Sequence, residues 1–157
     1  MNIHVINGPN LNMLGIREPE IYGKETYRDL VYKISEHAKT HNLTVTFTQS
    51  NHEGVLIDAI QNCYYEKVDA LIINPAAYTH YSIAIRDALK ILDIPIIEVH
   101  LSDIMNREPY RKNNMISDCV TFTISGKGTE GYIEAMDYLI TVTNKVETDG
   151  EPELNQV

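Results

Sequence analysis

Short apolar segments and longer amphipathic segments follow one another along this chain of 157 residues. Segments that are apolar or alternate with a period of two, and that are rich in β-branched residues, predict strands. These segments are 2–6, 43–49, 69–74, 95–100 and 119–125. Apolar residues recurring every three or four positions predict helices over 26–42, 53–67, 81–92 and 130–145. Thr26 is a suitable N-cap for the first helix.

The alternation of strands with helices indicates an α/β protein with a parallel sheet covered on both faces. Five strands favour the order 2-1-3-4-5 of a flavodoxin-like three-layer sandwich over the six strands of a dinucleotide-binding fold. We expect a single domain over residues 1–145 and an acidic, frayed tail over 146–157. Ligands of such sheets bind beyond the carboxyl ends of the strands, so the residues that follow each strand are the candidates for function.

The segment 7–25, directly after the first strand, has no regular period. Structureless loops longer than roughly 12–15 residues are uncommon in compact domains and are usually functional or disordered. Apolar residues such as Leu11, Leu14 and Ile21 favour an ordered segment that closes over a ligand. The segment also carries Arg17 and Tyr22, and a neighbouring guanidinium stabilises tyrosinate, the basic form of a phenol. The alternative is a surface arginine and an anchoring tyrosine.

Two further pairs of residues follow the fourth predicted strand. Glu98 and His100 point to the same side of that strand if it stays extended, and a carboxylate can orient a histidine for general acid catalysis. A structural pair at the strand end is the alternative. Arg107 and Arg111 lie four residues apart and suit recognition of a carboxylate or a hydroxyl. The alternative interpretation is that both arginines belong to a run of charged residues exposed to solvent.

Composition narrows the function classes. The net charge of −9 argues against a nucleic-acid surface. No stretch approaches the roughly 18 apolar residues of a membrane helix, and the N-terminus lacks the pattern of a signal peptide. Cys63 and Cys119 lack C-x-x-C spacing, which favours two reduced thiols in a cytoplasmic protein.

The motifs for cofactors are weak or incomplete. The sequence "GKGTEG" at 126–131 follows the last strand rather than the first, so a tight turn explains it better than dinucleotide binding. The segment 7–25 lacks a phosphate loop, which disfavours nucleotides and flavins. "HEG" at 52–54 has no second histidine one turn later, so we expect no metal there. No lysine stands at a predicted strand end, where a Schiff base would form. We therefore expect a functional site without cofactor or metal.

Five motifs in order resemble type II 3-dehydroquinate dehydratase, the dehydroquinase that forms no Schiff base. The motifs are "NGPNLNMLGIREPEIYG", "QSNHEG", "INPAAYTHYSIAIRDAL", "IIEVHLSDIMNREPYR" and "GKGTEGY". The resemblance covers residues 2–143, nearly the whole chain. It implies a flavodoxin-like, cofactor-free and metal-free lyase of the shikimate pathway. It also implies a homo-oligomer, usually a dodecamer built from trimers.

The resemblance also implies catalytic roles. Tyr22 would remove a proton next to the substrate ketone, and Arg17 would hold it as tyrosinate. His100 would protonate the departing hydroxyl, with Glu98 as its orienting partner. Asn10 would help to stabilise the enolate.

Further residues would bind the substrate by the same resemblance. Its hydroxyls would be bound by Asn74, His80 and Arg111. Its carboxylate would be bound by the backbone amides of Leu101 and Ser102. Asp87 would come from a neighbouring subunit, and Arg107 would support the lid as an additional charge.

One departure from the family pattern lies beside the carboxylate-binding amides. Asp103 stands where Asn is more usual, and we expect it to cap the turn that follows rather than to face the substrate. The competing hypotheses are a flavodoxin-like module that binds a small anion without chemistry, and a flavin electron carrier.

Overall fold

A computed structural model describes the backbone of residues 1–149 and the side chains of residues 1–144. Its five strands pair in parallel in the order β2-β1-β3-β4-β5, which confirms the predicted α/β topology. The strands are β1 (Asn2–Asn7), β2 (Thr44–Gln49), β3 (Ala70–Asn74), β4 (Ile96–His100) and β5 (Phe122–Ser125). No helix among the described residues is long and apolar enough to cross a membrane.

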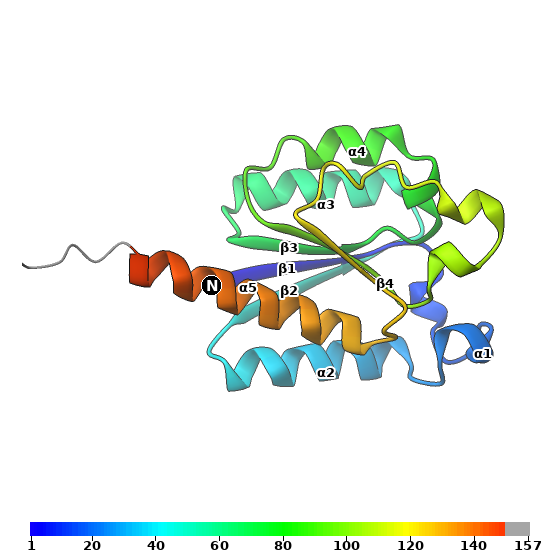
Figure 1. Cartoon of the computed structure of the whole chain (residues 1–157), viewed down its shortest axis with the longest axis horizontal. Coiled ribbons are helices and arrows are strands. Elements are labelled where there is room, and N and C mark those ends of the chain that lie inside the picture. The colour runs from blue at the N-terminus through cyan, green and yellow to red at the C-terminus, as the bar shows by residue number, and fades with distance from the viewer. Residues whose placement is uncertain (150–157) are drawn as a thin grey trace, which may run out of the picture.

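Helices cover both faces of the sheet, as expected for a three-layer sandwich (Figure 1). One face carries α2 (Tyr27–Thr40) and α5 (Glu130–Asp149), and the other carries α3 (Glu53–Tyr65) and α4 (Ile83–Leu89). Successive strand residues point to opposite faces, so each face has its own apolar core.

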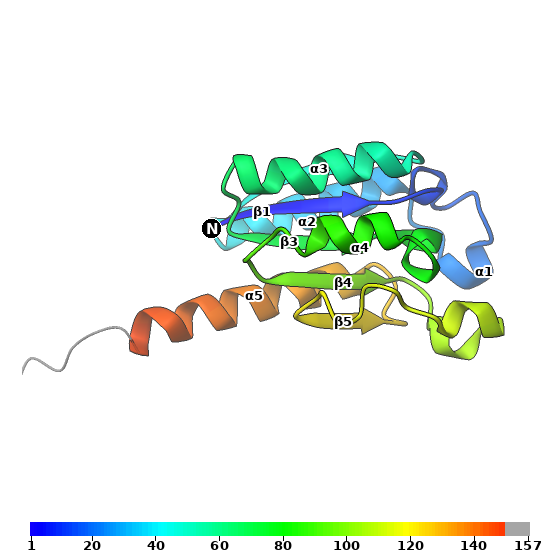
Figure 2. The same cartoon turned by 90° about the horizontal axis from the view of Figure 1, so that it is seen from above.

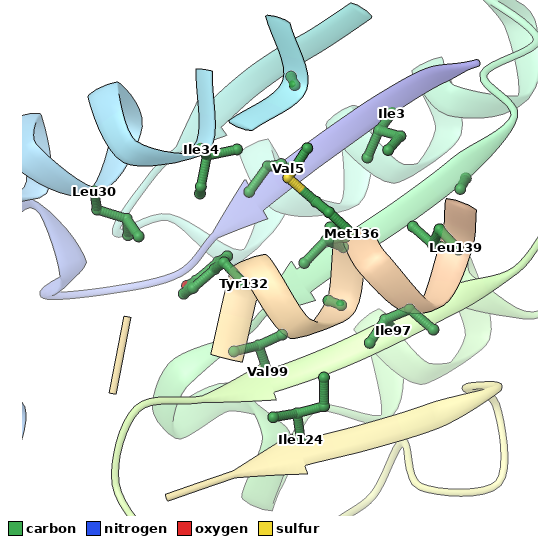
Figure 3. Close-up of a cluster of buried hydrophobic side chains, with 14 of the residues drawn as sticks. Ile3, Val5, Leu30, Ile34, Ile97, Val99, Ile124, Tyr132, Met136 and Leu139 are labelled. Carbon is green, nitrogen blue, oxygen red and sulfur yellow. The ribbon is translucent and has the colours of Figure 1, made fainter. Parts of the chain in front are cut away.

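Figure 3 shows the apolar side chains that pack between α5 and the sheet. Tyr132, Met136 and Leu139 lie on one face of the helix and are buried against the strands. Val99 and Ile124 on β4 and β5 complete this contact. The tight packing of α5 fixes the turn that precedes it, next to the carboxyl ends of β4 and β5.

Helix α2 begins as the sequence indicated. The Thr26 hydroxyl accepts a hydrogen bond from Asp29 N at 3.1 Å, and the Asp29 carboxylate accepts one from Thr26 N at 2.9 Å. This reciprocal capping box satisfies two backbone amides that a helix start leaves unpaired. The prediction of Thr26 as the N-cap is therefore confirmed.

Several element boundaries differ from the predicted ones. The segment 7–25 contains a 3₁₀ helix, η1 (Leu11–Met13), and a short helix, α1 (Pro19–Tyr22), so it is not a structureless loop. The last helix continues to Asp149, four residues past the expected boundary, because the first helix-breaking residues, Gly150 and Pro152, come only after it. The remainder of the expected tail, 150–157, lies outside the described residues.

Candidate active site

The strands β1, β3 and β4 end on the side of the molecule where α1 and the segment after β4 lie (Figure 2). A cleft is lined by residues that follow these strands and by residues of α1 and of the segment after β4. The space between its lining residues, counted together with the open solvent at its entrance, is about 520 Å³. Ten of the predicted site residues line it: Asn10, Arg17, Tyr22, Asn74, His80, His100, Leu101, Ser102, Arg107 and Arg111. Of the other two, Glu98 lies behind His100, and Asp87 lies on α4, outside the lining.

Two arginines flank Tyr22 at the mouth of the cleft. The Arg17 guanidinium carbon lies 4.7 Å from the centre of the Tyr22 ring, and that of Arg107 lies 5.3 Å from it. Arg107 also donates a hydrogen bond to the Tyr22 hydroxyl at 2.8 Å and to Ser102 Oγ at 3.2 Å. The guanidinium on the phenol oxygen is therefore that of Arg107, while Arg17 lies over the ring. Both guanidinium groups are therefore in contact with Tyr22.

Before and after Tyr22, the backbone at Gly15 and the backbone at Lys24 approach each other closely. Gly15 has a φ of 84°, in the left-handed region, and a Cβ at this position would lie 2.9 Å from Lys24 O. Glycine at position 15 therefore allows the backbone to pass close to Lys24 and closes residues 15–24 into a loop. This loop holds α1, and with it Tyr22, at the cleft.

Glu98 is fully buried and accepts four hydrogen bonds. Its Oε1 accepts from Thr79 Oγ1 at 2.6 Å and lies 2.5 Å from His100 Nε2. Its Oε2 accepts from Asn114 Nδ2 at 2.8 Å and from Thr123 Oγ1 at 3.0 Å. A buried carboxylate needs such donors to remain charged. Because Nε2 of His100 is committed to Glu98, Nδ1 is the nitrogen left for chemistry in the cleft.

These donors determine the charge of Glu98. Burial alone raises the pKa of this carboxyl, but the hydrogen bond and charge of His100, with the hydrogen bonds from Thr79 and Asn114, outweigh burial. The net pKa of Glu98 lies below its ordinary value. The spacing of Glu98 and His100 predicted their pairing, whereas no pattern in the sequence pointed to Asn114 or Thr123 as part of the site.

Replacing Thr123 with Val removes one donor from Glu98 and keeps the side-chain shape. The carboxylate loses stabilisation, so the pKa of Glu98 rises and the acid limb of the kcat–pH profile moves to higher pH. We expect kcat at neutral pH to fall by about tenfold or less, with KM unchanged because Thr123 does not line the cleft. Steady-state kinetics across pH measure this.

Two variants control that experiment. Thr123→Ser keeps the hydroxyl and should restore the parental pH profile. Thr121→Val removes a hydroxyl that accepts from Ile96 N at 3.1 Å but does not reach Glu98. Thr121→Val should therefore leave the kcat–pH profile unchanged. If Thr123→Val had the parental profile, the hydroxyl would not act through Glu98.

His80 is held in one orientation by a pair of hydrogen bonds with Asn113. His80 Nδ1 donates to Asn113 O at 2.7 Å, and Asn113 Nδ2 donates to His80 O at 2.7 Å. Burial lowers the pKa of His80, so the imidazole is neutral near pH 7. With its proton on Nδ1, the other nitrogen, Nε2, is an acceptor for a hydroxyl group in the cleft.

Other predicted ligands are fixed by local contacts. The Asn74 side chain donates to Tyr132 OH at 3.1 Å and accepts from Ala76 N at 3.1 Å, which orients its amide at the end of β3. Asn10 adopts a left-handed backbone with a φ of 69°, at the start of η1. Arg111 Nε donates to Glu108 Oε2 at 2.7 Å.

Asp103 caps the turn after β4, as expected. Its carboxylate accepts hydrogen bonds from Met105 N at 3.1 Å and from Asn106 Nδ2 at 2.5 Å, at the start of the 3₁₀ helix η3 (Ile104–Asn106). Asp103 does not line the cleft. Its charge is therefore used in the turn instead of facing a ligand.

Known proteins resemble the chain over most of its length. The family model described as dehydroquinase class II matches residues 1–140. A 3-dehydroquinate dehydratase of Caldicellulosiruptor bescii is 55% identical over 132 residues, covering 84% of this chain and 91% of that protein. One from Clostridium perfringens is 53% identical over 139 residues, covering 88% and 96%.

A solved structure agrees with these relatives. The crystal structure of a type II dehydroquinase from Butyrivibrio crossotus has a TM-score of 0.88 and 51% sequence identity, and the match covers 89% of this chain and 97% of that one. Fold and sequence thus agree with these relatives along most of the chain. This chain belongs to the class II dehydroquinase family.

Proposed function

We propose that this protein dehydrates 3-dehydroquinate to 3-dehydroshikimate, a step of the shikimate pathway towards aromatic amino acids. The observation that carries the proposal is the pairing of a base and an acid at one cleft. Tyr22 is in contact with two guanidinium groups, and His100, which is hydrogen-bonded to the buried Glu98, lines the same cleft. The family and the named relatives support the same activity.

The reaction takes two proton transfers. Tyr22, as tyrosinate, removes the proton on the carbon next to the substrate ketone, and the electron pair of the broken C–H bond forms an enolate. Asn10 helps to stabilise the enolate oxygen, as the family resemblance implies. The enolate then expels the C1 hydroxyl, which His100 protonates so that it leaves as water. The product is a conjugated enone.

The remaining residues of the cleft bind the substrate in this proposal. The substrate hydroxyls are bound by Asn74, His80 and Arg111. The backbone amides of Leu101 and Ser102 bind its carboxylate. The three arginines of the lining favour an anion in a chain whose net charge is −9.

We further propose that the enzyme is a homo-oligomer, a dodecamer of trimers, in which Asp87 completes the cleft of a neighbouring subunit. The α4 residues Ile85, Ala88 and Leu89 are buried. Asp87 is exposed on the outer side, one turn after Ile83 and one turn before Ile91. These isoleucines are 59% and 50% exposed. An apolar outer face of this kind supports a subunit contact.

Subunit mixing tests the role of Asp87. We expect Asp87→Ala and Tyr22→Phe homomers to have little activity, because each lacks part of every cleft. Mixed oligomers reassembled from both should regain activity at clefts that take Tyr22 from one chain and Asp87 from another. If Asp87 served its own chain, every mixed cleft would carry a defect and no activity would return.

An absorbance assay tests the proposed reaction. Adding 3-dehydroquinate to the purified protein should produce the ultraviolet absorbance of the conjugated enone. Borohydride with substrate should not inactivate the enzyme by trapping a Schiff base, because the described residues that line the cleft include no lysine. We also expect chelators to leave the rate unchanged. An absent signal would favour the alternative, a module that binds an anion without chemistry.

A cytoplasmic location is part of the same proposal. Both cysteines, Cys63 and Cys119, are free thiols, as expected in a reducing compartment.

The colour of the purified protein tests the remaining alternative. A yellow protein would support a flavin electron carrier over the proposed lyase.

A further inference from the structure

Three side chains that commonly bind metal ions meet outside the cleft, between α2 and α5. His37 and His41 lie one helical turn apart at the end of α2, and Asp137 comes from α5. Each offers one ligand atom, and these atoms all lie within 4.8 Å of one another. The end of α2 leads into the start of β2, so the cluster lies far from the carboxyl edge that carries the cleft (Figure 1).

The His41 imidazole is oriented by the backbone. Its Nδ1 lies 2.9 Å from the carbonyl oxygen of His37, which can only accept a hydrogen bond, so Nδ1 carries the proton. The Thr40 hydroxyl donates to the same carbonyl at 2.8 Å. In the neutral ring, Nε2 then holds the free lone pair. Metal-binding histidines commonly have this arrangement, in which the second nitrogen donates to a carbonyl.

His37 and Asp137 already form a link between the two helices. His37 Nε2 lies 2.7 Å from Asp137 Oδ1, and the rings of His37 and His41 have centres 4.4 Å apart. His41 is also the C-cap of α2, a helix of 14 residues. The carbonyl groups at a helix C-terminus favour positive charge, so a cation is stabilised at this position.

We propose that His37, His41 and Asp137 form a binding site for a divalent transition-metal ion such as Zn²⁺, which links α2 to α5. Two imidazoles and a carboxylate suit zinc, nickel or copper rather than magnesium or calcium, which prefer oxygen ligands alone. Ligands of a tetrahedral zinc ion lie about 3.4 Å apart. The three ligand atoms, which lie within 4.8 Å of one another, must therefore draw closer around the ion, and two of their side chains, His41 and Asp137, are exposed. The ion stabilises the fold and takes no part in the reaction.

Zinc binding to the full chain tests this site directly. After chelator treatment and dialysis, calorimetric titration with ZnCl₂ should give one ion per chain at this site and a higher melting temperature. His41→Gln and Asp137→Asn should each weaken binding by about tenfold or more, and His37→Gln with His41→Gln should abolish it. His52→Gln, which removes an exposed histidine that precedes α3 on the other face, should bind as the parent does.

Cobalt provides a second readout and separates the outcomes. Co²⁺ in the site should give d–d absorption bands that disappear in the double variant, while turnover of 3-dehydroquinate and the circular dichroism spectrum stay unchanged. Zinc affinity that is the same in the double variant would overturn the proposal, because the ion would then lie elsewhere. A titration without saturable binding would overturn it as well. Neither result depends on the proposed reaction.

Discussion

Tyr22→Phe is expected to lose roughly 10²–10⁴-fold in kcat while the enzyme still binds substrate. The substitution removes the phenol oxygen that accepts the proton and leaves the ring in contact with Arg17 and Arg107. Binding of the substrate should persist because the ligands for its hydroxyls and carboxylate remain. Steady-state kinetics give kcat, and equilibrium titration with substrate gives the affinity of the inactive variant.

A matched substitution controls this result. Tyr32→Phe removes a phenol oxygen from an exposed tyrosine of α2 that does not line the cleft, and it should turn over substrate at the parental rate. Near-normal kcat in Tyr22→Phe would mean that another group removes the proton.

The second large effect is expected at His100. His100→Gln keeps an amide that can donate to Glu98 but has no proton to transfer to the leaving hydroxyl, so kcat should fall by roughly 10²–10⁴-fold. Glu98 keeps its donors from Thr79, Asn114 and Thr123, and we expect the fold to survive. Steady-state kinetics measure the fall in kcat, and a thermal melt measures whether the fold survives.

His52→Gln is the control for the exchange of histidine to glutamine, because His52 is exposed and does not line the cleft. It should retain the parental kcat. If His100→Gln behaved in the same way, a different group would protonate the leaving hydroxyl, and the buried pair with Glu98 would be structural.

The alternation of strands and helices predicted the parallel sheet, and the ends of its strands predicted where the cleft lies, whereas the roles of most lining residues came from the family resemblance. The carboxyl ends of parallel strands meet at one edge, so polar residues after each strand converge there. Glu98 and His100 could be paired from their spacing within one strand. Their contact is local and follows from the extended backbone.

Contacts between distant segments could not be predicted in this way. The spacing of Arg107 gives no indication that its guanidinium reaches the Tyr22 hydroxyl, since 85 positions separate them. Asn114 reaches Glu98 from an irregular segment without a period. His37 and His41 show helical spacing in the sequence, but only the packing of α5 on α2 brings Asp137 beside them. Side-chain packing between elements decides each of these contacts.

Hydrogen exchange into the substrate tests most directly whether Tyr22 removes the proton and His100 delivers it to the leaving hydroxyl. In D₂O, NMR follows the hydrogen on the carbon next to the ketone of 3-dehydroquinate. His100→Gln should exchange this hydrogen for deuterium while forming little product, because proton removal by Tyr22 precedes loss of water. Tyr22→Phe should neither exchange nor dehydrate. Exchange catalysed by Tyr22→Phe, or its absence in His100→Gln, would contradict this division of roles.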